Sequence, residues 1–208
     1  MKQAFKVALF DLDGVILDTE SQYSRFWGEQ GREFHSEVPD FASRIKGQTL
    51  VEIFDRWFAG QAETQAEITR RLDSYEAAMT YNYIKGSRAY VEGLRQRGIL
   101  TAIVTSSNES KMRNVLRAHP EFHQLFDHIF TSEDFTASKP APDCYLLGIR
   151  HFGVEPSECV VFEDSVNGLR AGRSAGCYVV GLATTNPCDV VAPLSEIVID
   201  DFTSSLLP

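Results

Sequence analysis

The segment Lys6-Val7-Ala8-Leu9-Phe10-Asp11-Leu12-Asp13-Gly14 joins a short, mainly apolar run directly to two aspartates and a glycine. The run has the length and composition of a strand in a parallel sheet, because strands covered on both faces read as nearly continuous apolar stretches. The two carboxylates therefore follow the carboxyl end of a predicted strand. Taken alone, the segment indicates only that acidic side chains lie at a turn. The function of these aspartates depends on which other residues of the chain lie near them.

Several later runs share the character of this first strand, being short and β-branched or apolar. They are Leu100–Val104, His128–Thr131, Cys159–Phe162, Tyr178–Leu182 and, with a weaker pattern, Glu196–Ile199. Helical patterns separate these runs, at Ser87–Arg97, Ser110–Ala118, Pro142–Phe152 and Ser165–Ala175. Regular alternation of strand and helix predicts βαβ units with right-handed crossovers and a sheet covered on both faces. We therefore predict an α/β fold with a Rossmann-like parallel sheet core.

The stretch from Thr19 to Ile84 breaks this alternation, because it is rich in helical patterns and contains no convincing strand. Its large aromatic residues suit the interior of a helical bundle: Phe26, Trp27, Trp57 and Phe58. We therefore predict that residues 18–85 form a small α-helical cap domain inserted after the first strand. Residues 1–17 and 86–208 then form the Rossmann-like core domain.

The net charge of the 208-residue chain limits the kinds of partner that it can bind. The formal charge is −9 at pH 7, and nucleic acid is therefore an unfavourable main partner, because phosphate backbones attract basic surfaces. A small anionic substrate is still compatible with this charge, since a few local cations can hold one phosphate. We expect a monomer.

The sequence also bears on where the protein works. Its first residues lead into a strand-like run without a long apolar region, so we expect no signal peptide. No apolar run approaches the roughly 18 residues that would span a bilayer, so we expect no membrane partner. The four cysteines form no C-x-x-C pair and resemble reduced thiols: Cys144, Cys159, Cys177 and Cys188. These features together predict a cytoplasmic protein.

Chemically active side chains follow four of the predicted strands. They are Asp11 and Asp13, the segment Thr105-Ser106-Ser107-Asn108, Lys139, and the pair Glu163-Asp164. In open α/β sheets, ligands bind outside the carboxyl ends of the strands. We therefore expect these clusters, which lie far apart in the sequence, to meet in one crevice.

The residue types in these clusters suit phosphoryl transfer. Asp11, Asp13 and Asp164 can supply the oxygen ligands that Mg²⁺ prefers. A carboxylate can attack phosphorus and form an acyl-phosphate, which divides one difficult displacement into two easier ones. Lys139 supplies a cation and Thr105 a hydroxyl donor for the charge on the transferring group. Asp13 can protonate the leaving oxygen and later deprotonate the attacking water.

The four clusters resemble the motifs of the haloacid dehalogenase superfamily, and the resemblance covers nearly the whole chain. In chain order the motifs are Phe10-Asp11-Leu12-Asp13-Gly14-Val15-Ile16-Leu17-Asp18-Thr19, Ile103-Val104-Thr105-Ser106-Ser107, Ser138-Lys139-Pro140-Ala141-Pro142-Asp143 and Phe162-Glu163-Asp164-Ser165-Val166-Asn167-Gly168. A D-x-D tripeptide alone would be weak support, whereas four motifs in the right order and context are specific. The third and fourth look most like the β-phosphoglucomutase and phosphatase subgroup.

This resemblance implies roles for the acidic residues. Asp11 would be the nucleophile and a metal ligand, and Asp13 the general acid and base, with its backbone carbonyl on Mg²⁺. Asp164 would be a metal ligand, and Glu163 either a ligand or a partner of the ligands. The implied activity is a Mg²⁺-dependent phosphatase that acts through an aspartyl-phosphate intermediate.

The resemblance also implies a binding site for a small phosphorylated metabolite. Thr105, Ser106 and Lys139 would hold the phosphoryl group. The inserted helices are similar to the small cap of this superfamily, which closes over the site. Arg44 and Lys46 could line the cap side of that site, although lone cations are nearly as often solvated.

Asp13 and the cap residues separate the branches of the superfamily. Dehalogenases lack the second aspartate, so Asp13 leaves a phosphatase or a phosphomutase. Mutases of this type carry a cap histidine where this chain places Tyr23, and an arginine where Leu50 follows Lys46-Gly47. Without that arginine a second phosphate would not be gripped. We therefore favour a hydrolase, with a β-phosphoglucomutase-like isomerase as the alternative.

Simpler interpretations of each motif stand beside these. The D-x-D-G segment could begin a calcium loop, but position 12 of that loop is Gln22 rather than glutamate. Lys139 could be a surface lysine, and Glu163-Asp164 could be first-turn acids that favour a helix N-terminus. The whole chain could also be a non-catalytic binding module of the same fold. A binding module would not need both Asp11 and Asp13, so we favour the enzyme.

Overall fold

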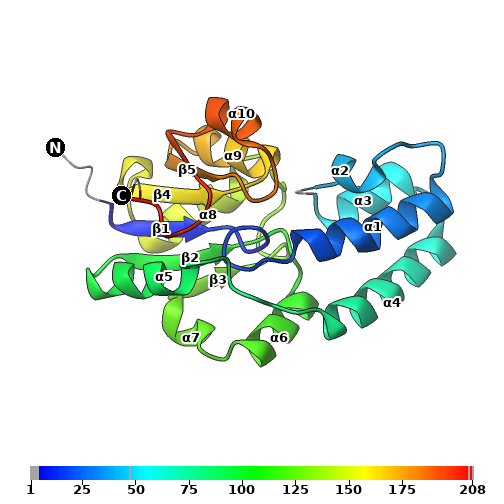
Figure 1. Ribbon diagram of the computed structural model, residues 1–208, viewed down its shortest axis with the longest axis horizontal. Coiled ribbons are helices and arrows are strands. Elements are labelled where there is room, and N and C mark those ends of the chain that lie inside the picture. The colour runs from blue at the N-terminus through cyan, green and yellow to red at the C-terminus, as the bar shows by residue number, and fades with distance from the viewer. Residues whose placement is uncertain (1–4, 47, 206, 208) are drawn as a thin grey trace.

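Six strands form one sheet in the order β3-β2-β1-β4-β5-β6, and every neighbouring pair is parallel (Figure 1). The computed structural model describes residues 5–46, 48–205 and 207. The strands are β1 (Val7–Phe10), β2 (Leu100–Val104), β3 (His128–Phe130), β4 (Cys159–Glu163), β5 (Tyr178–Leu182) and β6 (Ile197–Ile199). The predicted α/β class with a parallel sheet is confirmed, and each predicted strand lies within one residue of its expected bounds.

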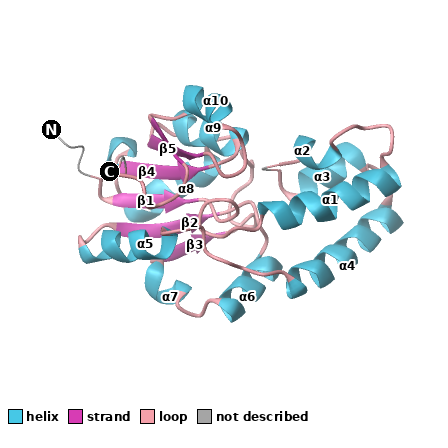
Figure 2. Ribbon diagram, in the orientation of Figure 1, coloured by secondary structure: helices cyan, strands magenta, loops and turns pink. Residues whose placement is uncertain are grey.

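Helices cover both faces of this sheet (Figure 2). They are α5 (Ser87–Gln96), α6 (Glu109–Ala118), α7 (Phe122–Leu125), α8 (Asp143–Phe152), α9 (Val166–Ser174) and α10 (Cys188–Val191), with 3₁₀ turns at Pro156–Glu158 and Ala192–Leu194. The four predicted helices of this part of the chain are present. The short helices α7 and α10 and the 3₁₀ turns were not predicted, because each is too short for a periodic pattern.

Side chains of the central strand β1 alternate between two apolar cores. Ala8 and Phe10 pack with the cluster that contains residues of α5 and α6, and Val7 and Leu9 pack with the cluster that contains residues of α8 and α9. Phe10 stacks on Phe162 of β4, with the ring centroids 4.5 Å apart. All four residues of β1 are fully buried, so the D-x-D-G segment emerges from the most protected strand of the sheet.

Helices α1 (Glu20–Phe34), α2 (Phe41–Arg44), α3 (Leu50–Trp57) and α4 (Ala62–Ala78) form a separate group, which we call the helical unit. It lies beyond the carboxyl ends of the strands, where the arrows of Figure 1 point. Its interior is a third apolar cluster, built from Phe26, Trp27, Phe41, Ile45, Ile53, Phe58, Ile68 and Leu72. Within the described part of residues 18–85 the structure has no strand. The domain limits at residues 17, 18, 85 and 86 stay a prediction.

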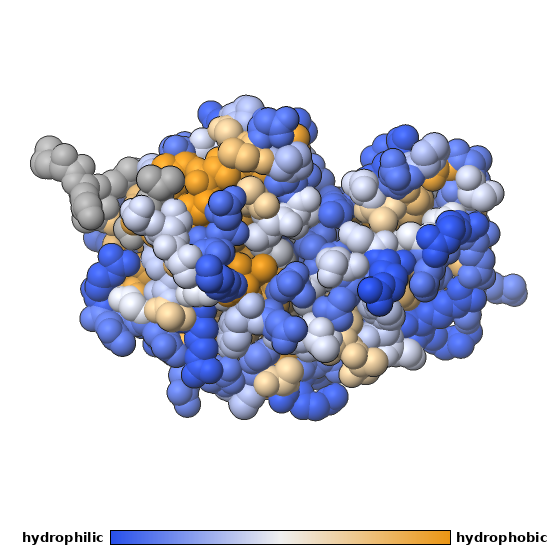
Figure 3. Space-filling view, viewed as in Figure 1, coloured by the Kyte–Doolittle hydropathy of each residue, from blue (hydrophilic) through white to orange (hydrophobic). Residues whose placement is uncertain are grey.

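The topology places a crevice at the centre of the sheet. The chain runs from β1 outward to β2 and β3 on one side, and then returns to β4, β5 and β6 on the other. Ligands of open α/β sheets bind where the strand order reverses in this way. The outline of the molecule is indented between the sheet and the helical unit (Figure 3). Among the helices of the described residues, none has the length and apolarity needed to cross a membrane.

Candidate active site

The residues that follow β1, β2 and β4 are held in place by the sheet itself. The Asp11 amide donates to the Phe162 carbonyl over 3.0 Å, and the Thr105 amide donates to the Phe130 carbonyl over 3.0 Å. Both bonds continue the ladders of the sheet by one residue beyond the strands. The carboxylate and the hydroxyl therefore stand at fixed positions at the carboxyl edge, as expected from the sequence.

Lys139 reaches this edge from the loop between β3 and α8. Its Nζ lies 2.5 Å from Oδ1 of Asp11, 2.6 Å from Oε1 of Glu163 and 3.1 Å from the Val104 carbonyl oxygen. Burial alone would lower the pKa of Lys139, but Asp11 and Glu163 raise it above its ordinary value. The lysine is buried and charged, so the interpretation of Lys139 as a surface residue is wrong.

Glu163 is fully occupied by hydrogen bonds. Its Oε1 also accepts from the Tyr145 hydroxyl at 2.8 Å, and its Oε2 accepts from the amides of Asp164 and Ser165 at 3.1 and 3.2 Å. A Cβ on Gly168 would overlap this carboxylate, so the first turn of α9 has room for it only because residue 168 is glycine. Both oxygens already accept hydrogen bonds, which connect Glu163 to Lys139, Tyr145 and the β4–α9 loop.

Asp11, Glu163 and Asp164 form an acidic cluster that fits a divalent cation. One ligand oxygen from each lies within 4.8 Å of the others. The buried Oδ2 of Asp164 has no hydrogen-bond partner among the described residues, and burial beside Glu163 and Asp11 raises the pKa of Asp164 well above its usual value. Three carboxylates face one lysine ammonium, so the cluster lacks positive charge. Oxygen ligands with excess negative charge suit a hard cation such as Mg²⁺.

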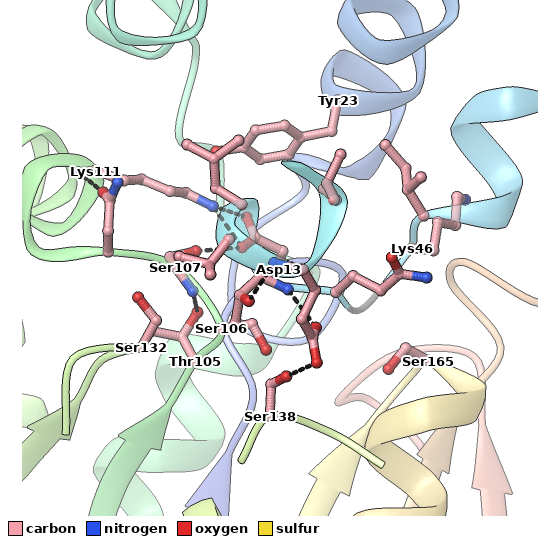
Figure 4. A pocket seen from close by; sticks show the side chains of 18 of the residues that line it. Asp13, Tyr23, Lys46, Thr105, Ser106, Ser107, Lys111, Ser132, Ser138 and Ser165 are labelled. Atoms are coloured by element: carbon pink, nitrogen blue, oxygen red, sulfur yellow. Dashed lines mark hydrogen bonds and ion pairs between the residues drawn. The ribbon is translucent and has the colours of Figure 1, made fainter. Parts of the chain in front are cut away.

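Asp13 points to a different partner, which the sequence analysis missed. Oδ1 of Asp13 lies 2.5 Å from the Nζ of Lys111, and its Oδ2 accepts from the Ser107 hydroxyl at 3.1 Å (Figure 4). The Thr19 hydroxyl also donates to this carboxylate. Lys111 lies in the first turn of α6, where a cation is unfavourable beside the helix dipole. A lysine in the first turn of a helix was the one feature of the sequence that could have identified Lys111 as a residue of the site.

Hydroxyl groups line the crevice beside Asp11. Oγ1 of Thr105 accepts from the Ser107 amide at 3.0 Å. Its neighbour Ser106 has a buried hydroxyl with no hydrogen-bond partner among the described residues. Both side chains line the same cavity as Asp11 and Asp13, so they can donate to an oxyanion bound there.

That cavity has a volume of about 850 Å³ and lies between the sheet and the helical unit. Asp11, Asp13, Thr105, Ser106 and Asp164 line its sheet side, and Tyr23, Lys46, Leu50 and Glu76 line its helical side. Lys139, whose Nζ contacts Asp11, borders a smaller neighbouring hollow instead. The sheet thus supplies the chemically active groups, while the helical unit encloses them.

The two cations predicted to line the helical side differ in position. Lys46 lines the cavity and pairs with Glu20, with 3.4 Å between Nζ and Oε2. Arg44 is exposed, borders the smaller hollow and donates from Nε to the Pro39 carbonyl. The structure therefore brings Lys46 to the site and leaves Arg44 outside the main cavity. Gly47, the partner of Lys46 in the predicted motif, lies outside the described residues.

The fold and the site agree with comparisons to known proteins. The sequence profile of haloacid dehalogenase-like hydrolases matches residues 5–176. The chain is 35% identical to hexitol phosphatase A of Escherichia coli (strain K12) over 187 residues, covering 87% of this chain and 83% of that protein. It is 29% identical to the fructose-1-phosphate phosphatase YqaB of the same strain over 193 residues, covering 86% and 97%.

A solved structure supports the same conclusion about the fold. The crystal structure of β-phosphoglucomutase from Clostridium difficile superposes with a TM-score of 0.79 at 22% identity, covering 95% of this chain and 92% of that one. The chain belongs to the haloacid dehalogenase-like hydrolase family. Within that family it is a phosphoric monoester hydrolase, as hexitol phosphatase A and the fructose-1-phosphate phosphatase are.

Proposed function

We propose that the protein is a Mg²⁺-dependent phosphatase that removes phosphate from a small metabolite through an aspartyl-phosphate on Asp11. The observation that carries this proposal is the group of Asp11, Lys139 and Asp164 at one sheet edge. The Nζ of Lys139 lies 2.5 Å from Oδ1 of Asp11, and a carboxylate oxygen of Asp164 lies within 4.8 Å of one of Asp11. A nucleophile, a phosphate-neutralising cation and a metal ligand are the parts that such chemistry needs.

The reaction divides into two displacements. In the first, a carboxylate oxygen of Asp11 attacks phosphorus, the bond to the substrate oxygen breaks, and Asp13 gives that oxygen a proton. In the second, water attacks the same phosphorus, Asp13 takes its proton, and inorganic phosphate leaves as Asp11 is regenerated. Thr105 and Ser106, which line the cavity, donate to the phosphoryl oxygens, and the Lys139 ammonium beside Asp11 offsets their negative charge.

We assign the metal site to residues whose oxygen atoms are not all engaged in hydrogen bonds. Asp11, Asp164 and the backbone carbonyl of Asp13 would hold Mg²⁺, with Glu163 as their support. When bound, Mg²⁺ neutralises charge on the phosphoryl group and orients it. Burial raises the pKa of Asp11 to about 7; the Lys139 ammonium opposes this rise, and the nearby carboxylates of Glu163 and Asp13 add to it. A bound cation would relieve the crowding of these carboxylates.

We propose that the helical unit acts as a cap that selects the substrate. A cavity of about 850 Å³ is of the size that small-molecule sites have, and closure excludes bulk water from the reacting groups. Two of the relatives act on phosphorylated hexitols and on fructose 1-phosphate, as their names state. We therefore propose a phosphorylated sugar or polyol of similar size. Free thiols at Cys144, Cys159, Cys177 and Cys188 support a cytoplasmic enzyme, which we take to be a monomer.

Two residues of the helical unit favour hydrolysis over a mutase reaction. Tyr23, at the position of the mutase histidine, turns its hydroxyl to Glu76 with 2.7 Å between the oxygens. Leu50, at the position of the mutase arginine, lines the cavity without a charge. Lys46 is paired with Glu20. A bisphosphate intermediate thus meets little that would hold its second phosphate, and water completes the reaction.

The nucleophile is tested by Asp11→Asn, assayed for phosphate release from a panel of phosphorylated sugars and polyols with Mg²⁺. Loss of the nucleophile should lower kcat by roughly 10³-fold or more, while Asp200→Asn, an exposed aspartate after β6, should retain normal turnover. Substantial turnover by Asp11→Asn would exclude the aspartyl-phosphate. The mutase alternative is tested with β-glucose 1-phosphate and a trace of the 1,6-bisphosphate. Rapid, bisphosphate-dependent formation of glucose 6-phosphate would reverse our preference.

A further inference from the structure

Lys111 occupies a position that helix stability does not explain. It lies in the first turn of α6, two residues after Glu109, and the Asn108 side chain caps that turn by accepting from the Lys111 amide at 2.9 Å. The positive end of the helix dipole disfavours a cation there. Lys111 is nevertheless only 2% exposed, and burial of a lone ammonium is costly. Something outside the helix must offset both costs.

Asp13 provides that compensation. The Lys111 Nζ contacts both carboxylate oxygens of Asp13, at 2.5 Å from Oδ1 and closer to Oδ2. It is the one ammonium that contacts Asp13 within the part of the chain that the structure describes. The pair joins the N-terminus of α6 to the turn after β1, across 98 residues of sequence. A contact to both oxygens fixes the rotation of the carboxyl group, which a single hydroxyl donor cannot do.

The other side of the ammonium is covered by the helical unit. The Nζ lies 4.3 Å from the centroid of the Tyr23 ring, within the range of a cation–π contact. The Tyr23 hydroxyl in turn donates to Oε1 of Glu76 on α4 at 2.7 Å. Figure 4 shows Lys111 reaching Asp13 with Tyr23 above it. Lys111 therefore lies at the point where the helical unit contacts the catalytic edge of the sheet.

We propose that Lys111 is a positioning residue that holds the Asp13 carboxyl group for proton transfer, with Tyr23 holding Lys111 from the helical unit. This inference rests on the proposed role of Asp13 as general acid and base. Proton transfer requires the carboxyl group to lie within hydrogen-bond reach of the substrate oxygen. Without Lys111, the remaining side-chain donors to this carboxyl group among the described residues would be two neutral hydroxyls, Thr19 on Oδ1 and Ser107 on Oδ2.

A direct contact with substrate is the competing explanation, because Lys111 lines the cavity. The two explanations differ in how the effects of mutations combine. A residue that acts only through Asp13 has nothing left to act on once Asp13 is changed, whereas an independent substrate contact adds its own loss. A purely structural role would also add, and it would lower stability without a consistent effect on turnover.

The test is a double-mutant cycle with the phosphorylated hexose or hexitol that the unmodified protein hydrolyses fastest, because an alcohol leaving group needs the proton that Asp13 supplies. Lys111→Met, Asp13→Asn and the double variant are compared for kcat and KM in Mg²⁺, and Lys111→Gln is measured in parallel in case one replacement folds poorly. Lys85→Met is the matched control, because Lys85 is an exposed lysine that also pairs with an aspartate, Asp201. Thermal unfolding of each variant checks that it is folded.

The expected result is a loss of about 10²-fold in kcat for Lys111→Met, with KM nearly unchanged and with no further loss when Asp13→Asn is already present. Multiplicative losses in the double variant, or a change confined to KM, would overturn the inference. The proposed function fails separately. If Asp13→Asn retains full turnover, Asp13 is not the general acid and base; if Asp13→Asn is slow and the losses multiply, only the role of Lys111 is wrong.

Discussion

Gly14 and Asp164 approach so closely that no other residue fits at position 14. A Cβ added to Gly14 would lie 2.8 Å from Cγ of Asp164 and 2.7 Å from Oγ1 of Thr185. The φ angle of Gly14 is +75°, a left-handed conformation that L-residues other than glycine adopt at a cost. The glycine of the D-x-D-G segment thus lets the turn after β1 contact the loop after β4, and so brings Asp164 to Asp11.

Gly14→Ala should therefore impair the acidic cluster more than it impairs the fold. We expect at least a tenfold rise in the Mg²⁺ concentration for half-maximal activity, as changes beside metal ligands give. Gly153→Ala is the matched control: its φ angle is +64°, but nothing lies within 4 Å of the added Cβ. It should cost stability alone, about 1 kcal/mol. Equal Mg²⁺ dependence of the two variants would show that the contact with Asp164 is not needed.

Metal removal should abolish activity, and the Mg²⁺ concentration that restores activity should depend on Asp164. EDTA treatment is expected to leave folded but inactive protein, and added Mg²⁺ should restore turnover. In Asp164→Asn the restoring concentration should rise by about 10- to 100-fold, because a buried ligand loses its charge. Calorimetric titration of the folded variants with Mg²⁺ measures this independently of turnover. Full activity in EDTA would exclude a metal-dependent mechanism.

Glu163 should act as a support whose loss slows chemistry. Tyr145→Phe removes the donor that lies 2.8 Å from Oε1, and loss of one buried hydrogen bond should lower the free energy of unfolding by about 1 kcal/mol. Glu163→Gln also weakens the hold on Lys139, so kcat should fall by roughly 10-fold or more. Tyr83→Phe removes a comparable bond to Glu121, 3.0 Å long, away from the site. It should affect stability alone, and a similar fall in kcat there would contradict the role of Glu163.

Much of the fold could be predicted from local sequence, because each strand and each longer helix carries its own periodic pattern. The convergence of Asp11, Thr105, Lys139 and Asp164 followed from one rule, that parallel strands present their carboxyl ends at one edge. The sequence could not predict that both carboxylate oxygens of Glu163 accept hydrogen bonds. One of the donors is the Tyr145 hydroxyl, and no sequence pattern links Tyr145 to Glu163.

Other features of the site depend on side-chain direction across the sheet and the helical unit. Lys111 pairs with Asp13 across 98 residues, and no local pattern specifies that pairing. Arg44 and Lys46 are two residues apart, yet of the two it is Lys46 that lines the main cavity, because Arg44 is the last residue of α2 whereas Lys46 follows that helix. The sequence thus identified which residues follow the strands. The ion-pair partners of these residues could be identified only from the tertiary structure.

Glu52 links the helical unit to the loop that carries Lys139. One oxygen of its carboxylate caps α3 by accepting from the Thr49 amide at 3.0 Å, and the other accepts from the hydroxyl of Ser138. Ser138 directly precedes Lys139. A single side chain therefore completes a helix cap and holds the loop that carries Lys139 toward the helical unit, which would favour the closed arrangement of the cavity.

Ser138→Ala should remove this link without touching the catalytic groups. Loss of one hydrogen bond to a charged group, about 1.5 kcal/mol, corresponds to a fall of roughly tenfold in the closed population. We expect KM for the preferred phosphorylated metabolite to rise by up to that factor, with kcat changed little, because chemistry in the closed state is intact. Ser74→Ala, which removes an exposed hydroxyl bond within α4, should leave both constants unchanged. A loss in kcat with constant KM would mean that Ser138 instead positions Lys139 for the chemical step.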